Sequence, residues 1–308
     1  MSRKSPDSPI LDVSGLVLKT VRGREPEGLD FRLEAGQVMG VVGPPSSGKS
    51  SLLAILAGLR TDFTGKVEIC GWPVGPSTRS LTGYVSSTPG VYEELSCQEY
   101  LEFFAEAFEV DLHYRPYLIR ECLRLVRLDG FQDKLVSTMS YGSRRWLGMA
   151  RALIHDPDLF LMDDCLVKLE RAERTQLVEI LSELRGRGRA LVLCSETLAE
   201  LSELCSHVCI LVADRVLACG RVRDLLPKLV NFRMMQVQFE AGFRAAVRFL
   251  ERNEQVYHLS VSTQTGNLVR FLYDGDVNAF TTLLKLLQAE GCSIVSYAED
   301  QDFLGKAR

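Results

Sequence analysis

The chain has 308 residues, enough for two domains and a sizeable core, with 46% hydrophobic and 25% charged residues, as is ordinary for a globular protein. The net charge of −4 argues against a protein that binds nucleic acid by neutralising phosphates, so we expect no nucleic-acid partner.

The N-terminus and the cysteines predict a reducing, cytoplasmic compartment. Residues 1–9 are polar, which predicts a flexible N-terminus, and the first ten residues lack the apolar core of a signal peptide. No apolar run approaches the roughly 20 residues of a membrane-spanning helix. Most of the nine cysteines lie in apolar surroundings, as expected of buried reduced thiols. A metal site at Cys205 and Cys209, with His207 between them, is the alternative.

The first third of the chain predicts short strands around one loop. Alternation of apolar and polar residues indicates strands at 11–19 and 29–33, and residues 64–71 form another strand bounded by glycines. The valine-rich run at 38–42 predicts a buried strand. It breaks into a Gly/Pro/Ser loop that is followed by a helix over residues 52–57.

This loop matches the pattern G-x-x-x-x-G-K-[ST] between a strand and a helix, the context that a phosphate-binding P-loop requires. Its glycines allow backbone N–H groups to close on an anion, and the helix N-terminus adds a favourable dipole. We expect Lys49 to reach the β- and γ-phosphates of ATP and the Ser50 hydroxyl to hold Mg²⁺. The alternative is a glycine-rich turn that binds nothing. The predicted ATP-binding residues are Gly43, Pro44, Pro45, Ser46, Ser47, Gly48, Lys49, Ser50 and Ser51.

A mostly helical block follows at about residues 95–156. Residues 96–99 (SCQE) form a capping box, which predicts the start of an amphipathic helix that continues to residue 108. Two further helices are predicted over residues 119–128 and 142–154. Because the block interrupts the α/β pattern, we interpret it as an inserted subdomain.

Two acidic residues follow a short buried strand at 159–162. Asp163 is placed to complete the Mg²⁺ shell of a P-loop, and Asp164 to polarise an attacking water molecule. The elements expected next are a helix at 171–184, a strand at 190–194, a helix at 198–204 and a hairpin at 208–218. Strands that alternate with helices predict a mostly parallel α/β sheet.

The pattern changes after residue 227. The predicted elements are strand 232–240, helix 243–253, strand 256–263, strand 267–273, helix 277–289 and strand 292–297. This β-α-β-β-α-β order is that of a ferredoxin-like α+β domain, so we predict a separate domain over residues 228–308. It holds no catalytic cluster, and we interpret it as a regulatory or dimer-supporting module.

With these motifs in place, residues 10–226 resemble the nucleotide-binding subunit of an ABC transporter. The motifs that carry the resemblance are the P-loop, residues 139–145 (MSYGSRR), residues 150–153 (ARAL) and residues 156–164 (DPDLFLMDD). Their order and spacing match the Walker A, signature and Walker B elements of the family. The small C-terminal domain and residues 92–104 look most like subunits of drug- or polysaccharide-type exporters.

The resemblance implies a P-loop NTPase fold over residues 10–227, a RecA-like core with a helical insert, and ATP with Mg²⁺ as cofactors. Two such subunits would sandwich two ATP molecules, so that Ser140 and Gly142 contact the ATP of the partner. It further implies a separate transmembrane permease and a peripheral location on the cytoplasmic membrane face.

Four positions of the nucleotide site depart from the family pattern. Val21 stands where an aromatic residue usually stacks on adenine, and Ser87 replaces a glutamine. Asp164 replaces the catalytic glutamate, and Glu196 replaces a histidine that contacts the γ-phosphate. A carboxylate at position 196 would be repelled by phosphate.

Four further departures lie in the signature and in the loop after Walker B: Tyr141 for glycine, Ser143 for glutamine, Lys168 for glycine and Glu170 for aspartate. Three hypotheses remain open. The chain is an ATP-hydrolysing exporter subunit, or an ATP-holding partner with little turnover in a homodimer or heterodimer. The third hypothesis is a soluble regulator that dimerises through its last domain.

Overall fold

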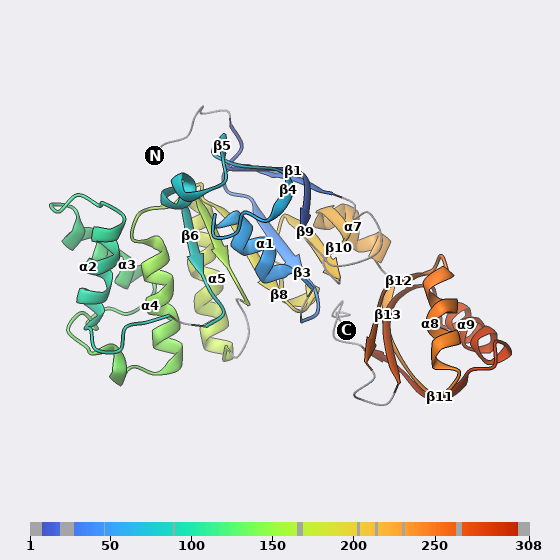
Figure 1. Cartoon of the computed structure of the whole chain (residues 1–308). Helices are drawn as coiled ribbons and strands as arrows, with labels where there is room; N and C mark the ends of the chain where they lie inside the picture. The colour runs from blue at the N-terminus through green and yellow to red at the C-terminus, as the bar shows by residue number, and fades with distance from the viewer. Residues whose placement is uncertain are drawn as a thin grey trace.

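The computed structural model describes residues 8–18, 28–45, 47–88, 90–164, 169–201, 204–212, 215–229, 232–262 and 267–300. These residues form three sheets: two in the body of the molecule and one in the C-terminal part, where two helices accompany it (Figure 1). A group of helices lies at the opposite end of the body.

The first sheet is antiparallel and has the strand order β2-β1-β4-β5. Leu11 is paired with both Leu33 and Ile69, and all three side chains are buried. The predicted strands of this region are confirmed, with bounds β1 (Leu11–Leu18), β2 (Leu29–Leu33) and β4 (Phe63–Ile69); β5 (Trp72–Pro73) is short.

The central sheet has the order β10-β9-β3-β8-β7-β6, and all of its pairings are parallel except that of β9 with β10. This confirms the predicted parallel sheet and the predicted hairpin. The strands are β3 (Val38–Val42), β6 (Thr82–Val85), β7 (Leu159–Met162), β8 (Ala190–Ser195), β9 (His207–Val212) and β10 (Arg215–Arg221). Strand β6 was not predicted from the sequence, because its four residues, TGYV, show no clear alternation.

Strands β3, β7 and β8 are buried along their whole length because the central sheet is covered on both faces. On β7, Leu159 and Leu161 join the core that contains the first sheet and α1 (Lys49–Leu56). Phe160 and Met162 point to the other core, which contains the helical block. Two hydrophobic cores therefore hold the strand that carries Asp163.

The helical block consists of α2 (Cys97–Ala107), α3 (Arg115–Leu125) and α4 (Tyr141–Leu153), between β6 and β7. The capping box is present: Ser96 Oγ accepts a hydrogen bond from Glu99 N–H at 3.2 Å, and Glu99 Oε2 accepts one from Ser96 N–H at 2.8 Å. Helix α3 begins four residues before the predicted start, because Pro116 is tolerated in a first turn. The body also contains η1 (Pro76–Leu81), η2 (Val136–Thr138), α5 (Arg171–Gly186) and α6 (Leu198–Leu201).

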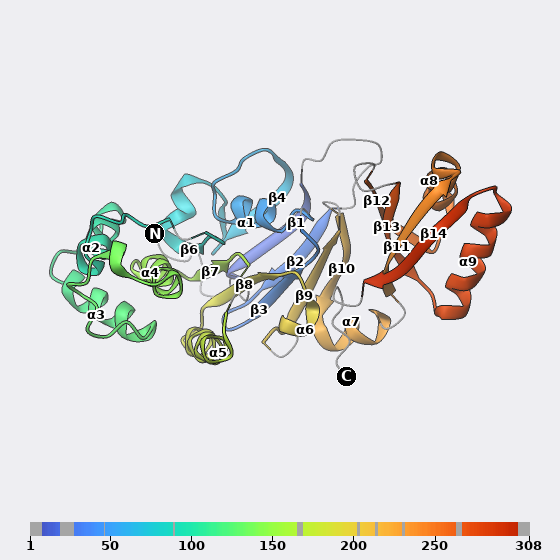
Figure 2. The same ribbon diagram turned by 90° about the horizontal axis from the view of Figure 1, so that it is seen from below.

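The C-terminal sheet is antiparallel with the order β12-β13-β11-β14 and has helices on one face (Figure 2). Its elements are β11 (Phe232–Ala241), α8 (Phe243–Arg252), β12 (Val256–Ser262), β13 (Leu268–Asp274), α9 (Val277–Ala289) and β14 (Ser293–Asp300). All six were predicted. On the helix-free face, Met234 and Leu272 join the same buried cluster as Val222 of the body.

The predicted boundary at residue 227 falls inside a helix, α7 (Val222–Leu229). The sequence suggested this boundary because the pattern of elements changes after it. Although a proline removes one backbone hydrogen bond, α7 continues for two residues past Pro227. The domain limits themselves stay a prediction. In the part of the chain that the structure covers, every helix is too short or too polar to cross a bilayer.

His155 joins the helical block to the central sheet. Its Nε2 atom lies 3.2 Å from the Thr82 carbonyl oxygen on β6, and its ring stacks on Phe108 with the centroids 3.8 Å apart. Burial lowers the pKa of this imidazole from 6.5 to about 4, although the Thr82 carbonyl opposes the shift. The neutral ring is therefore a component of the folded state.

We expect the stability of the chain to fall as the pH falls from 6.5 towards 4, because the unfolded state then binds a proton at His155 that the folded state excludes. The full difference corresponds to roughly 3 kcal/mol. His155→Gln should flatten the dependence of the melting temperature on pH between 7 and 5. His113→Gln, at an exposed histidine, should leave it unchanged. An equal slope in wild type and His155→Gln would contradict this assignment.

Candidate functional site

The P-loop begins at Gly43, directly after β3, and ends at Gly48, which precedes α1 with a left-handed φ of 96°. The Gly43 N–H donates to the Ser195 carbonyl at 3.3 Å, which ties the loop to the end of β8. A Cβ at position 43 would lie 2.2 Å from the Leu211 carbonyl oxygen and 2.4 Å from Ser47 Oγ. Only glycine fits there. Ser46, also predicted to bind ATP, lies outside the described residues.

Lys49 lies over this loop with only 6% of its surface exposed. Its Nζ donates hydrogen bonds to the carbonyl oxygens of Gly43 at 2.7 Å and Pro44 at 3.0 Å. A phosphate oxygen would replace these two neutral acceptors with a charged one, which forms a stronger hydrogen bond with an ammonium group. The hydroxyl of Ser47 is buried and has no hydrogen-bond partner within the described part of the chain.

Two other predicted P-loop residues have different surroundings. Pro45 is exposed, whereas Ser51 Oγ accepts a hydrogen bond from Arg60 Nη1 at 2.9 Å. Arg60 also pairs with Asp62, so a cation stands next to the start of α1. The hydroxyl of Ser51 is therefore engaged with Arg60.

Asp163 and Ser50 are brought together at the start of α1. Asp163 is 3% exposed, and its Oδ1 atom has no hydrogen-bond partner in the residues that the structure describes. Burial raises the pKa of this carboxyl group, whereas a hydrogen bond from Ser50 and the charge of Lys49 lower it. A carboxylate beside a hydroxyl, with one buried oxygen unpaired, is an oxygen donor set of the kind that suits Mg²⁺.

Asp164, half-buried, follows in a left-handed conformation with φ of 46°. Its carbonyl oxygen accepts a hydrogen bond from Arg145 Nη2 at 2.5 Å. Arg145 comes from α4 and is 6% exposed, so a buried guanidinium group holds the backbone at the predicted catalytic position. This role was not predicted from the sequence, because α4 carries three arginines, Arg144, Arg145 and Arg151, and only the packing shows that Arg145 is the buried one.

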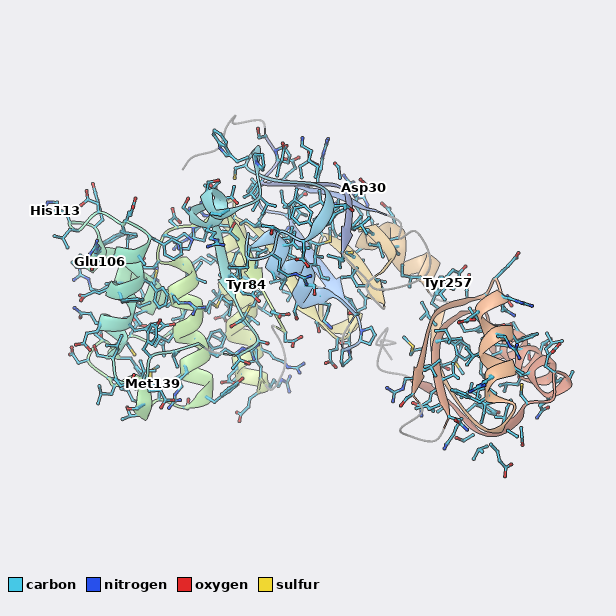
Figure 3. All side chains as sticks on the ribbon, in the orientation of Figure 1. Asp30, Tyr84, Glu106, His113, Met139 and Tyr257 are labelled. Carbon is cyan, nitrogen blue, oxygen red and sulfur yellow. The ribbon has the colours of Figure 1, made fainter. Side chains whose placement is uncertain are left out.

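Of the remaining residues predicted for this site, two are exposed and two lie outside the described residues. Glu196 is exposed directly after β8, next to Ser195, which accepts from the P-loop. Ser87 is exposed after β6, the strand of Tyr84 in Figure 3. Val21 and Lys168 lie outside the described residues.

Ser140 and Gly142 stand at the N-terminal end of α4. Ser140 Oγ accepts from Ser143 N–H at 3.1 Å and caps the helix. A Cβ at position 142 would lie 2.5 Å from Oε1 of Glu173, a residue that the sequence analysis overlooked. Where the chain is described, no hydrogen bond joins Ser140 or Gly142 to the P-loop. Their predicted contact with a partner's ATP stays a prediction.

The alternative metal site at Cys205, His207 and Cys209 gains no support. Burial raises the pKa of Cys205 to about 12, and Cys209 is paired across the β9–β10 hairpin with Cys219. Among the residues covered by the structure, no group of three or more His, Cys, Asp or Glu side chains could hold a metal ion. Cys209 and Cys219 face each other in the hairpin but form no disulfide bond.

Comparison with known proteins gives consistent matches. The family model described as "ABC transporter" matches residues 26–167. The Nod factor export ATP-binding protein I of Cupriavidus metallidurans is 31% identical over 214 residues, which cover 68% of this chain and 71% of that protein. The protein of the same name from Rhizobium meliloti is 31% identical over 215 residues, which cover 68% of this chain and 64% of that protein.

Solved structures of ABC transporter components also resemble this chain. One described as the ATP-binding subunit of an ABC transporter aligns with a TM-score of 0.64 and 25% identity, covering 71% of this chain and 93% of its own. The cbiO1 protein of Clostridium perfringens aligns with a TM-score of 0.64 and 18% identity, and the alignment covers 72% of this chain and 92% of cbiO1. The second likeness concerns the fold alone.

We expect Gly43→Ala to abolish stabilisation by Mg–ATP and to destabilise the chain, because the new methyl group would overlap the Leu211 carbonyl oxygen. The matched control is Gly148→Ala in the middle of α4, where a Cβ would meet no atom within 4 Å. The control should be neutral or stabilising by up to about 1 kcal/mol. Thermal unfolding with and without Mg–ATP measures both. A Gly43→Ala variant that still responds to Mg–ATP would contradict the geometry of the loop.

Proposed function

This chain belongs to the family of ABC transporter ATP-binding subunits, and on that premise we propose that it holds Mg–ATP at the P-loop and drives a separate membrane permease of the exporter type. The observation that carries the proposal is the meeting of Lys49, Ser50 and the unpaired oxygen of Asp163 at one end of the central sheet. The exporter assignment is supported by relatives named as Nod factor export proteins.

Each residue of the site has a separate part in binding. Lys49 would exchange its bonds to the Gly43 and Pro44 carbonyls for bonds to phosphate oxygens. Ser50 and Asp163 would hold Mg²⁺, which would supply positive charge against the phosphates. The backbone N–H groups of the loop and of the first turn of α1 would donate to phosphate oxygens.

We expect ATP turnover to be slow because the side chains at positions 164 and 196 are poorly suited to activating a water molecule for attack on the γ-phosphate. The Asp164 side chain is one methylene shorter than glutamate, and a displacement of roughly 1 Å can reduce a rate about a hundredfold. Glu196, exposed beside the site, adds a negative charge where the family has a histidine. We therefore favour ATP hydrolysis by this chain at a reduced rate. An ATP-holding partner with no turnover is the second candidate, and the same two residues support it.

The partners of the chain follow from its family. We propose that two subunits close on two ATP molecules and that the assembly lies on the cytoplasmic face of the membrane. Tyr92 and Phe103 contribute an exposed aromatic surface to the helical block, 47% and 50% exposed, with their ring centroids 5.5 Å apart. Exposed apolar surface of this kind is suited to contact with a permease. Closure of the two subunits would then be coupled to the permease through this surface.

We expect Mg–ATP to raise the melting temperature of the chain and Lys49→Ala to remove that effect, because ligand bound to the folded state stabilises it by about 2.7 kcal/mol at a hundred times the dissociation constant. Lys285→Ala, at an exposed lysine of α9, is the control and should respond as wild type does. If saturating Mg–ATP leaves the melting temperature of the wild-type chain unchanged, the proposed function is wrong.

We expect the double substitution Asp164→Glu with Glu196→His to raise the steady-state ATPase rate by about a hundredfold, because it restores both the length and the charge that the site lacks. Phosphate release is the measurement, with Lys49→Ala as the blank. A wild-type rate equal to the blank would support the second candidate, that of an ATP-holding partner. A double variant no faster than wild type would show that Asp164 and Glu196 do not limit turnover.

A further inference from the structure

The side chain of Glu173, in the first turn of α5, lies beside Gly142 at the N-terminal end of α4. Its Oε2 atom accepts a hydrogen bond from the Glu170 N–H at 3.0 Å. Its Oε1 atom fills the space beside Gly142 that a Cβ would occupy. Figure 3 labels Met139, which lies just before this end of α4. The half-buried carboxylate is thus held between two helix N-termini.

The end of α4 is a favourable place for a negative charge. A helix N-terminus carries about half a positive charge, and α4 has no acidic residue in its own first turn. Ser140 already caps the Ser143 N–H, and the N–H groups of Tyr141 and Gly142 in the same first turn have no acceptor within the helix. The cation that follows them in sequence, Arg144, is bonded to the Ser137 and Met139 carbonyls and to Glu93. Glu173 supplies the anion that this helix end lacks.

We propose that the Glu173 carboxylate stands in for a phosphate at the N-terminus of α4 and so opposes the docking of ATP carried by a second copy of this chain. The proposal rests on the proposed function, in which two subunits close on two ATP molecules, and on the prediction that Ser140 and Gly142 contact the ATP of the partner. A phosphate that approaches these N–H groups would come close to the Glu173 carboxylate, whose Oε1 atom lies beside Gly142, and two like charges repel each other. Closure therefore requires Glu173 to leave its position, which breaks its bond to Glu170.

A purely structural part for Glu173 is the alternative. In that case the residue only completes the first turn of α5, as the third residue of a capping box does. Both alternatives predict that Glu173→Ala costs stability. They differ for Glu173→Gln, which keeps an oxygen to accept from the Glu170 N–H and removes the charge.

The test compares the self-association of the full chain as wild type, Glu173→Gln and Glu183→Gln, by sedimentation, while Mg²⁺ and the non-hydrolysable analogue AMP-PNP are titrated. Glu183 is the matched control because it is an exposed carboxylate of the same helix, paired with Arg187 in the last turns. The melting temperature with and without nucleotide reports binding at the chain's own P-loop, which Glu173 does not touch.

We expect Glu173→Gln to associate at about fivefold lower nucleotide concentration than wild type, since a charge at a helix N-terminus is worth about 1 kcal/mol. Glu183→Gln should match wild type, and all three chains should show the same nucleotide-induced rise in melting temperature. Association of Glu173→Gln at an equal or higher nucleotide concentration than wild type, or no association of it at all, overturns the proposal. Absence of the rise in melting temperature in every chain overturns the proposed function instead.

Discussion

The structure depends on two buried charges of opposite sign at one end of the central sheet. The Lys49 ammonium group and the Asp163 carboxylate are almost completely removed from solvent, and a buried charge is tolerated only where partners compensate it. Lys49 finds them in two loop carbonyls, and Asp163 in Ser50, with one oxygen left over. The two hydrophobic cores hold these groups at fixed positions. Binding of a triphosphate with Mg²⁺ would satisfy both groups at once.

Helix N-termini recur wherever the chain is expected to meet phosphate. Helix α1 begins at Gly48, and α4 begins at Ser140 next to Gly142. At α1 the Lys49 ammonium group lies over the loop, whereas at α4 a carboxylate from α5 lies beside Gly142. The difference is one of local charge, since the N-terminal ends of both helices carry the same positive dipole. In the proposed dimer, the two helix ends would therefore meet phosphate with different local charges.

The P-loop could be predicted because its residues are consecutive and their spacing alone fixes the chemistry. The position of Asp163 near Ser50 and Lys49 could be predicted because a strand end carries it to the same edge of the sheet as the P-loop, whereas its part in holding Mg²⁺ stays a prediction. Arg145 could not, since its contact with Asp164 joins residues 19 apart on different elements. The boundary predicted at residue 227 rests on a change in the pattern of elements, and the sequence did not reveal that α7 runs from Val222 to Leu229 across this position.

By itself, the sequence determined the parallel sheet, the ferredoxin-like order of the last elements and the identity of the phosphate-binding loop. Each of these follows from periodicity or from residues adjacent in the chain, which the backbone must place together. Only the tertiary structure decided that Arg145 holds Asp164 and that Glu173 lies against Gly142. Such contacts depend on how α4 and α5 pack against the central sheet. The sequence fixes the charges of Arg145 and Glu173. The distances from these side chains to Asp164 and Gly142 depend on the packing of the two hydrophobic cores.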